Sequence, residues 1–360
     1  MNKNLENLII CPNCLNTLDI NNTYCKNCNY RYEYNFDIFD LRLIDNRTKG
    51  FNINRDKKIS KVLIDNYDKF RYFNGLYNFF EVLASLKNVN NINFDQLYKK
   101  FNLKNKDTPL TPSQSIHGYD ILDKINLYLE DINYKPYQYN VCLENGCGLG
   151  FFVEGFSRKF SQILVVDFSL SYLVLTKKIT NEKKINNCLF ICASVENLPI
   201  KNNSIDLIHS NNVIEHISDQ AKMVSEMSRV VNNSGYAFIL SPNKFSVYIE
   251  PHFGFPFYGF VPKIIRKWIV YKTKNIDCDI VSLISLRQLK KILKENFLGQ
   301  FHISFLPSSI KKSAQGGKIR SIIIYCLNNK LIGLFFNLLI NKILISLMPY
   351  HVVIAKKKLD

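Results

Sequence analysis

The sequence lacks the features that mark several common classes of protein. No long apolar run precedes its first cysteines, which argues against a secretory signal. It contains no internal repeat, no arginine-rich block and no basic–aromatic repeat of the kind found in nucleic-acid-binding proteins. Its 360 residues are 47% hydrophobic and only 21% charged, so most of the chain is expected to fold, into two or three domains.

Cysteine usage points to a reducing compartment. Four of the ten cysteines cluster near the N-terminus, and the other six stand singly in apolar or loop surroundings. These six are Cys142, Cys147, Cys188, Cys192, Cys278 and Cys326. Because secreted proteins pair their cysteines in disulfides, this pattern predicts a cytoplasmic protein.

The net charge of +17 admits two interpretations. The lysines are scattered through a chain rich in Asn, Lys, Ile and Tyr, which favours a compositional bias with a generally basic surface. The alternative is a polyanionic partner such as RNA, whose phosphates attract basic surfaces. The same charge would suit the anionic inner face of a membrane.

Residues 1–45 are predicted to form a small cysteine module, a zinc ribbon. Two C-x-x-C pairs stand ten residues apart, Cys11 with Cys14 and Cys25 with Cys28. Two facing pairs of this kind make a tetrahedral cage of four thiolates, which suits Zn²⁺ better than iron. Since protein ligands fill all four positions, the metal is expected to be structural and to supply most of the module's folding free energy.

The rest of the chain divides near residue 136. Residues 46–135 are polar, with apolar residues at helical spacing near 67–86 and 121–129, and are predicted to form a linker and a helical cap. In residues 136–360 short apolar strands alternate with helices, which indicates an α/β fold with a parallel sheet. The predicted strands are Tyr139–Leu143, Gln162–Asp167, Cys188–Ala193, Ile205–Ser210, Tyr236–Ser241, Phe301–Phe305 and His351–Lys356.

Several segments of this region depart from simple alternation. Asn232–Gly235 reads as a turn between a helix and the next strand. Residues 244–285, rich in Pro, Gly and aromatics, are predicted to be a lid, after which a helix resumes over Ser285–Asn296. Residues 319–347 are strongly apolar but interrupted by Asn and Lys, which favours a buried or substrate-site helix over a helix on the membrane surface.

A glycine loop, Val141–Gly150, joins the first of these strands to a helix. Glycines there let the backbone turn sharply and approach a ligand closely. A dinucleotide-binding loop reads G-x-G-x-x-G, but its last glycine would fall on Phe151, so the spacing argues against that ligand. The loop reads E-x-G-x-G-x-G from Glu144, and the second strand ends at Asp167, where a carboxylate can accept hydrogen bonds from two ribose hydroxyls.

Further motifs follow in order at Ala193–Pro199, Ser204–Ile208 and Ser210–His216. With the glycine loop, they make residues 139–243 resemble the class I S-adenosylmethionine-dependent methyltransferases, in the subgroup with an EHV-type motif after strand four. The resemblance implies a Rossmann-like sheet of seven strands, the last antiparallel, with the cofactor over its carboxyl edge. The N-terminal module resembles the zinc ribbons fused ahead of several bacterial methyltransferases.

The resemblance also implies which residues contact the cofactor. The glutamate and the first two glycines of the loop would line the methionine end of the cofactor. Asp167 would hold the ribose, and the motif Ala193–Pro199 would flank the adenine. The expected contacts are Glu144, Gly146, Cys147, Gly148, Asp167, Phe168, Ser194, Val195 and Asn211. The family often has Asp where this chain has Ser194, and a hydroxyl is a weaker acceptor for the adenine amino group than a carboxylate.

Three neighbouring residues have structural explanations that compete with a functional one. Gly150 would serve close packing between helix and strand, Asp206 would start a strand, and Glu215 would cap a helix N-terminus.

Methyl transfer needs an aligned acceptor and, for some acceptors, a base. His216, after strand four, and His252 and Tyr258, in the lid, are the candidates; the alternative for His216 is a structural hydrogen bond. The predicted function is O-methylation of a small or lipid-linked metabolite. Nucleobase amino methylation usually comes with a Pro-Pro-aromatic turn at strand four, where this chain reads Asn-Asn-Val-Ile, which argues against that reaction.

Two alternatives remain at the level of sequence. One is an rRNA or tRNA methyltransferase that holds RNA with the ribbon and the basic surface. The other is a non-catalytic protein that binds cofactor or a partner. Contact with the inner membrane face, through residues 319–347, is a further expectation for a cytoplasmic protein with a lipid-linked acceptor.

Overall fold

The computed structural model describes residues 6–43, 51–69, 140–250, 252–274, 277–297, 299–304 and 346–357. The strands in these ranges are β1 (Tyr24–Cys25), β2 (Tyr30–Arg31), β3 (Glu33–Asn35), β4 (Ile38–Asp40), β5 (Val141–Asn145), β6 (Gln162–Asp167), β7 (Cys188–Cys192), β8 (Ile205–Asn211), β9 (Val231–Pro242), β10 (Gly299–Ser304) and β11 (Tyr350–Lys357). The α-helices are α2 (Ile53–Asp65), α7 (Val153–Ser157), α8 (Leu170–Glu182), α9 (Gln220–Val230), α10 (Lys263–Lys274) and α11 (Leu286–Asn296). Short 3₁₀ helices are η1 (Tyr67–Lys69), η2 (Ile214–His216), η3 (Tyr258–Phe260) and η4 (Cys278–Ile280).

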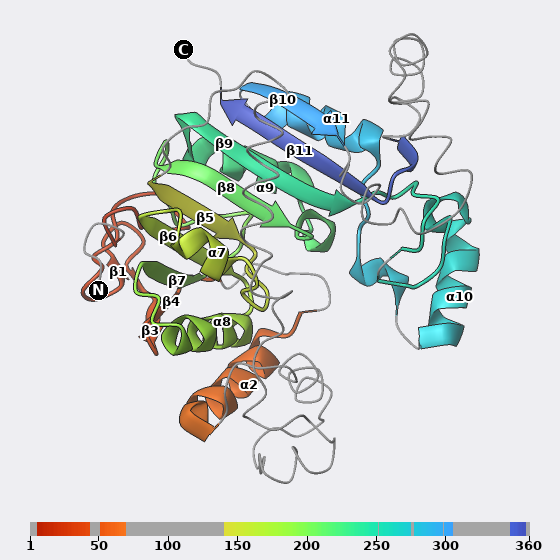
Figure 1. Cartoon of the computed structure of the whole chain (residues 1–360). Helices are drawn as coiled ribbons and strands as arrows, with labels where there is room; N and C mark the ends of the chain where they lie inside the picture. The colour runs from red at the N-terminus through yellow and green to blue at the C-terminus, as the bar shows by residue number, and fades with distance from the viewer. Residues whose placement is uncertain are drawn as a thin grey trace.

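The central sheet is mostly parallel, as the alternation of strands and helices predicts. Within the described residues its order is β10-β11-β9-β8-β5-β6-β7-β4-β3 (Figure 1). β5 pairs in parallel with β6 and β8, β6 with β7, and β8 with β9. β11 is antiparallel to both of its neighbours, β9 and β10, which agrees with the antiparallel last strand implied by the resemblance.

In the described part of the chain, the sheet has nine strands rather than the seven expected. The two additional strands, β3 and β4, come from residues 1–45, which the sequence suggested to be a separate ribbon. β4 pairs in parallel with β7, and β3 is antiparallel to β4. Ile38 and Phe39, on opposite faces of β4, are each only 1% exposed. This hairpin therefore covers the edge of β7 and ties the N-terminal segment to the sheet.

The turn predicted at Asn232–Gly235 lies inside β9. Opposite it, the pair Ile205↔Val231 is followed directly by Leu207↔Tyr236, so residues 232–235 form a bulge. The Ser234 amide donates to Asn232 Oδ1 at 2.9 Å, as in a turn. The local turn chemistry is present, but strand pairing on both sides of the bulge continues the strand through it.

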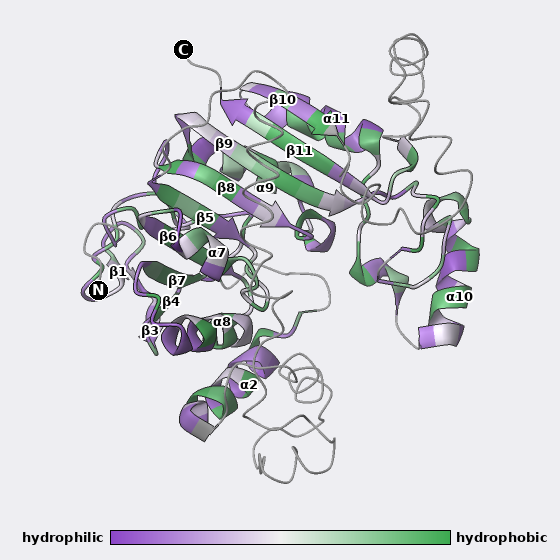
Figure 2. Cartoon of the chain, viewed as in Figure 1, coloured by the Kyte–Doolittle hydropathy of each residue, from purple (hydrophilic) through white to green (hydrophobic). Residues whose placement is uncertain are grey.

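Helices cover both faces of the sheet (Figure 1). On one face α2, α7 and α8 bury Leu63, Phe156 and Leu173 completely. On the other face α9 and α11 bury Met227 and Leu289 just as fully, beside the cysteine module. The central strands are apolar along most of their length (Figure 2), which is typical of parallel strands buried on both sides. The polar residues at their carboxyl ends therefore stand out as candidates for function.

The helix expected from Ser285 is confirmed as α11, and Ser285 forms a capping box with Gln288. The predicted lid contains η3, α10 and η4. Of the predicted cap, α2 and η1 are described, while residues 70–139 and most of the apolar segment 319–347 lie outside the described residues. Among the helices that the structure describes, none is long and apolar enough to cross a membrane.

Candidate active site

A cavity of about 660 Å³ opens at the carboxyl edge of the sheet. This volume lies within the range of small-molecule sites, about 300–1,000 Å³. Eight of the nine expected cofactor contacts line it: Gly146, Cys147, Gly148, Asp167, Phe168, Ser194, Val195 and Asn211. The structure thus brings together residues from the ends of β5, β6, β7 and β8, while their role as cofactor contacts stays a prediction.

The glycine loop has the close approaches that its sequence indicates. Gly146 has φ +91°, and a Cβ there would lie 2.4 Å from Val213 Cγ2. Gly150 has φ +75°, and its Cβ would lie 2.6 Å from Thr176 Cγ2 on α8. Gly150 therefore serves the packing of the loop against α8, which was its structural alternative, whereas Gly146 lies in the cavity wall.

Asp167 is held in place by the loop and by the start of α8. Its Oδ2 accepts a hydrogen bond from the Gly148 amide and its Oδ1 accepts one from the Ser169 amide, each at 2.8 Å. Burial raises the pKa of Asp167 to about 6, although the two amide hydrogen bonds oppose this. Each carboxylate oxygen keeps a lone pair that can accept from a ribose hydroxyl, so the residue fits the predicted role.

Glu144 is the expected contact that does not line the cavity. It is 1% exposed, and its Oε2 lies 2.7 Å from His209 Nδ1 on the adjacent strand β8. The His209 ring is stacked on Phe238, at an interplanar angle of 10°. Because strand alternation directs Glu144 to this face of the sheet, its carboxylate is used within the core. Burial raises the pKa of Glu144, and the contact with His209 counteracts that effect.

Asn211 and Ser194 both line the cavity. Asn211, the last residue of β8, has a buried Oδ1 without a hydrogen-bond partner. A carbonyl oxygen without a partner suits a neighbouring methylsulfonium, which carries positive charge. The Ser194 hydroxyl accepts from the Glu196 amide at 3.2 Å and lies 3.3 Å from a Glu196 carboxylate oxygen. Glu196 thus adds a carboxylate two residues after the position where the family often has Asp.

A buried network that no sequence pattern predicted fixes the residues that follow Asp167. Asp56 on α2 accepts from the amides of Leu170 and Ser171, at the N-terminus of α8. Arg42 bridges Asp56 (2.9 Å) and Asp40 (2.6 Å), and also donates to the carbonyl of Phe168 (3.1 Å). The N-terminal segment and α2 therefore fix the end of β6 and the start of α8. Asp56 is one of many charged residues in the polar segment 46–135, so the sequence did not indicate that it pairs with Arg42.

Asp206 has the structural role that was its alternative. Its Oδ2 accepts from the amides of Asn140 and Val141, at 2.9 and 2.8 Å. These contacts fix the start of β5, at the edge of the sheet opposite to the cavity.

The two candidate histidines meet beside the cavity. Their rings, His216 from η2 and His252 from the lid, are 5.2 Å apart between centroids, and His216 lines the cavity. Desolvation and the neighbouring His252 lower the pKa of His216 to about 4. Burial would lower the pKa of His252, but its 2.6 Å contact with Glu250 Oε1 outweighs this and raises it.

Glu215 and Tyr258 differ from expectation. Burial raises the pKa of Glu215 to about 7, and neither of its carboxylate oxygens has a hydrogen-bond partner, so it caps no helix. Asp219 is the N-cap of α9 instead. Tyr258 is stacked on Phe253, at 4.8 Å between ring centroids, in the apolar core of the lid. It does not line the cavity and is therefore no candidate base.

The four cysteines of the N-terminal module lie together. Their sulfur atoms are all within 4.8 Å of one another, with Cys11 and Cys28 3.7 Å apart and Cys14 and Cys25 3.6 Å apart. Cys11 and Cys25 are fully buried. The arrangement fits the four-thiolate cage that the spacing predicts.

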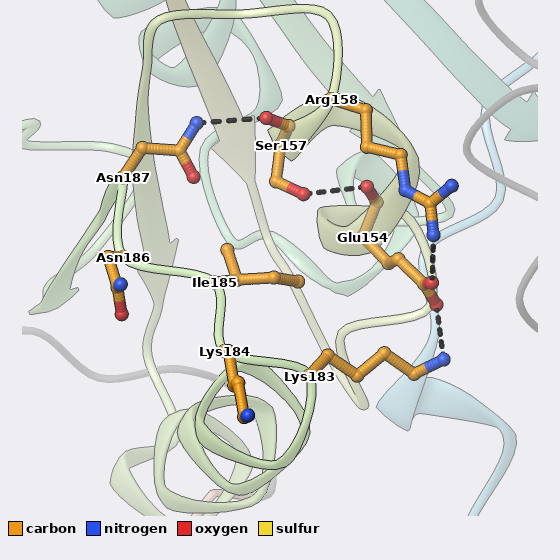
Figure 3. A pocket seen from close by; sticks show the side chains of 8 residues that line it. All are labelled: Glu154, Ser157, Arg158, Lys183, Lys184, Ile185, Asn186 and Asn187. Atoms are coloured by element: carbon orange, nitrogen blue, oxygen red, sulfur yellow. Dashed lines mark hydrogen bonds and ion pairs between the residues drawn. The ribbon is translucent and has the colours of Figure 1, made fainter.

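A second cavity, of about 610 Å³, lies at the amino edge of the sheet (Figure 3). It is formed by α7 and by the loop between α8 and β7. Arg158 and Lys183 both bind Glu154 there, at 3.1 and 2.9 Å. Because the carboxyl ends of the strands lie at the other edge of the sheet, this cavity is separate from the candidate active site.

Comparison with known proteins assigns the central part of the chain. Residues 143–239 match the family described as a methyltransferase domain. This segment is identified as a methyltransferase domain. The match reaches from β5 into β9 and so includes β6, β7 and β8, whose carboxyl ends line the cavity together with the end of β5.

The relatives of this methyltransferase domain share only parts of the chain. A probable S-adenosylmethionine-dependent methyltransferase of Mycobacterium tuberculosis is 28% identical over 28% of this chain and 35% of its own length. The mitochondrial ubiquinone biosynthesis O-methyltransferase of Dictyostelium discoideum is 24% identical over 53% of this chain and 67% of its own. The chain spans 53% of an uncharacterised protein of Methanocaldococcus jannaschii and 42% of an uncharacterised methyltransferase of Schizosaccharomyces pombe, so it covers about half or less of the length of these relatives.

The chain is also similar to solved structures over part of its length. Phosphoethanolamine N-methyltransferase 2 of Haemonchus contortus, in complex with S-adenosyl-L-methionine, is 13% identical, with a TM-score of 0.44. The alignment covers 75% of this chain and 61% of that protein.

Proposed function

We propose that the whole chain is an S-adenosylmethionine-dependent methyltransferase that O-methylates a small or lipid-linked metabolite. The observation that carries the proposal is the cavity at the carboxyl edge of the sheet, which Asp167, Asn211 and His216 line together. A ubiquinone biosynthesis O-methyltransferase and a malonyl-[acyl-carrier protein] O-methyltransferase are among the relatives, and both names describe O-methylation. The EHV-type subgroup, suggested by Glu215 and His216, is part of this proposal.

The residues that line the cavity have different roles in the proposal. When bound, S-adenosylmethionine supplies an activated methyl group on a sulfonium. Asp167 would hold the ribose, the backbone of the glycine loop would face the methionine part, and Asn211 would lie beside the sulfonium. An acceptor entering past His216 would meet the methyl group from the open side of the cavity. Exclusion of water by the aromatic lining, which includes Phe51 and Phe152, would favour in-line transfer.

Calorimetry with S-adenosylmethionine tests the cofactor part of the proposal. The expected result is one binding site per chain for the wild type and none measurable for Gly148→Val, whose side chain would enter the open space above the loop. Arg158→Gln, at the second cavity, is the control and should bind normally. Equal affinities in all three proteins would refute the assignment of the cavity.

The surface of α10 supports a lipid-linked acceptor. Ile264, Trp268 and Tyr271 are 84%, 63% and 61% exposed, and Phe257 and Phe260 of the same lid are about half exposed. The sequence of α10, KIIRKWIVYKTK, has five basic residues and no acidic one. An exposed apolar face with flanking lysines is typical of helices that lie in the interface of an anionic membrane. We therefore propose that α10, within the lid, contacts the membrane that holds the acceptor.

Vesicle sedimentation tests this contact. Wild-type protein should bind vesicles that contain anionic phosphatidylserine and bind neutral phosphatidylcholine vesicles weakly. Trp268→Ser with Ile264→Ser should lose most of the binding, while Lys294→Ser on α11 is the control. Equal sedimentation of the double variant and the wild type would refute a role for α10, and preferential binding to RNA that weakens with salt would favour the RNA alternative.

The cysteine module is proposed to hold one structural Zn²⁺. The sulfur distances and the burial of Cys11 and Cys25 support this. Cys14→Ser should lower the zinc content by one equivalent per chain and should expose the β3–β4 edge of the sheet to proteolysis, because metal binding supplies the folding free energy of such modules. Unchanged zinc content by atomic emission would contradict the proposal.

A further inference from the structure

We infer that Glu215, His216 and His252 hold a divalent metal cation at the mouth of the cavity, and that the cation binds the acceptor oxygen. This inference rests on the proposed function for the role of the cation, but not for its binding. The three side chains bring their ligand atoms within 4.8 Å of one another. In a site with metal–ligand distances of about 2.1 Å, ligand atoms stand roughly 3.4 Å apart, so the cluster has to contract by at most about 1.4 Å.

The strongest support for a metal site is the buried carboxylate of Glu215. Its side chain is completely buried, and neither carboxylate oxygen has a hydrogen-bond partner. Its backbone carbonyl, in contrast, accepts from the Ser282 amide at 2.7 Å, which fixes η2 against the lid. A buried carboxylate without any partner costs several kcal/mol, and proteins relieve that cost by pairing the group or by coordinating a metal. The two histidines lie beside its oxygens, and the Glu250 carboxylate and the Tyr350 hydroxyl are also near.

His252 has the partner that a metal-binding histidine normally has. Its Nδ1 lies 2.6 Å from Glu250 Oε1, and Glu250 is only 3% exposed. The other Glu250 oxygen accepts from the Phe253 amide at 2.7 Å, which fixes the carboxylate. A carboxylate that accepts the Nδ1 proton leaves Nε2 with its lone pair free for a metal, and this pairing is common around metal-bound histidines.

The ligand set indicates the kind of metal. Two imidazoles and one carboxylate suit Zn²⁺, Fe²⁺ or Mn²⁺ and leave coordination positions open for water or substrate. Since His216 also lines the cavity, an open position faces the space where the acceptor enters. This differs from the cysteine module, where all four positions belong to the protein.

With the cation bound, no side chain has to act as a general base. An acceptor hydroxyl bound to a divalent cation loses its proton to solvent at a lower pH than the free hydroxyl does. The resulting oxygen anion forms the new O–CH₃ bond while the S–CH₃ bond breaks, and the sulfonium becomes a neutral thioether. His216 and His252 then act as ligands and take no proton from the acceptor.

Zinc stoichiometry tests the inference. Each protein is stripped with chelator, dialysed with Zn²⁺, passed through a desalting column and analysed by atomic emission. The wild type should hold one zinc per chain more than Glu215→Gln and His252→Gln, while the cysteine module contributes equally to all. Glu295→Gln, an exposed residue paired with Lys291 on α11, is the matched control and should keep the wild-type content.

Thermal unfolding separates loss of the site from loss of the fold. Without metal, Glu215→Gln should melt at or above the wild-type temperature, because the variant removes a buried charge. Added Zn²⁺ should stabilise the wild type further than either variant, since ligands that bind the folded state raise its stability. Equal zinc content and equal stabilisation in wild type and variants would overturn the inference. Calorimetry with S-adenosylmethionine on the same proteins tells this failure from a failure of the proposed function, which would abolish cofactor binding in the wild type.

Discussion

The replacement Asp167→Asn tests the cavity at its most defined residue. The carboxylate has two oxygens, each already accepting one backbone amide at 2.8 Å. In the proposal each oxygen accepts a second hydrogen bond, from one ribose hydroxyl. Asparagine has a single acceptor oxygen and carries no charge, so at least one ribose hydroxyl loses its acceptor.

The expected loss of affinity follows from these contacts. A hydrogen bond to a charged acceptor is worth about 1.5–3 kcal/mol, so the loss of one such bond and the weakening of the other should cost about 3 kcal/mol. This corresponds to roughly 100-fold weaker binding of S-adenosylmethionine. The stability of the unliganded protein should change little. Burial that raises the pKa of Asp167 from 3.8 to about 6 costs on the order of 3 kcal/mol at neutral pH, and the variant exchanges this cost for one unsatisfied amide, worth about 1–3 kcal/mol.

The pH dependence of binding provides the second measurement. Because the pKa of Asp167 is about 6 in the unliganded protein, ribose binding to the ionised form weakens as pH falls through 6. Wild-type affinity should be about tenfold lower at pH 5 than at pH 7.5, and the affinity of Asp167→Asn should not show this change. Calorimetry at several pH values and urea unfolding supply both sets of numbers. A variant that binds within threefold of the wild type, or that keeps the acid-side loss, would refute the role of Asp167.

Three further changes test the supports of the site. Gly146→Ala should weaken cofactor binding and lower stability by about 2 kcal/mol or more in urea, because the backbone is at φ +91° and the new Cβ would meet Val213; adding Val213→Ala should recover the steric part, and no recovery would contradict the clash. Asp56→Ala should lower the free energy of unfolding by about 3–5 kcal/mol, because Arg42 would lose a buried partner; a loss under 1 kcal/mol by urea unfolding would argue against the network. His209→Phe should leave Glu144 buried without a partner and lower the melting temperature more at pH 8 than at pH 5. The reason is that burial raises the pKa of Glu144, so the carboxylate is more readily protonated at pH 5. An equal shift of the melting temperature at both pH values would show that the pairing does not matter.

Local chemistry in the sequence predicted the centre of the methyltransferase domain. Short apolar strands between helices predicted β5 to β8 to within two residues at either end. The spacing of the glycines after Glu144 argued against a dinucleotide loop. Because residues that follow parallel strands meet at one edge of the sheet, the sequence also predicted eight residues that line one cavity. The two C-x-x-C pairs likewise predicted that the four cysteine sulfurs would lie together.

The tertiary structure decided what depends on contacts between distant segments. Glu144 directly precedes the glycine loop that lines the cavity. Its carboxylate nevertheless lies in the core, where it contacts His209, 65 residues further along the chain. The β3–β4 hairpin joins the sheet because β7 offers an unpaired edge, and no local pattern in residues 33–40 predicts which edge that is. The Arg42–Asp56 pair and the cluster of Glu215 with His216 and His252 are likewise long-range. The sequence by itself determined the domain and the edge of the sheet at which the cavity opens, because both depend on local order along the chain. Only folding showed which charges are paired and which, like Glu215, are left for a ligand.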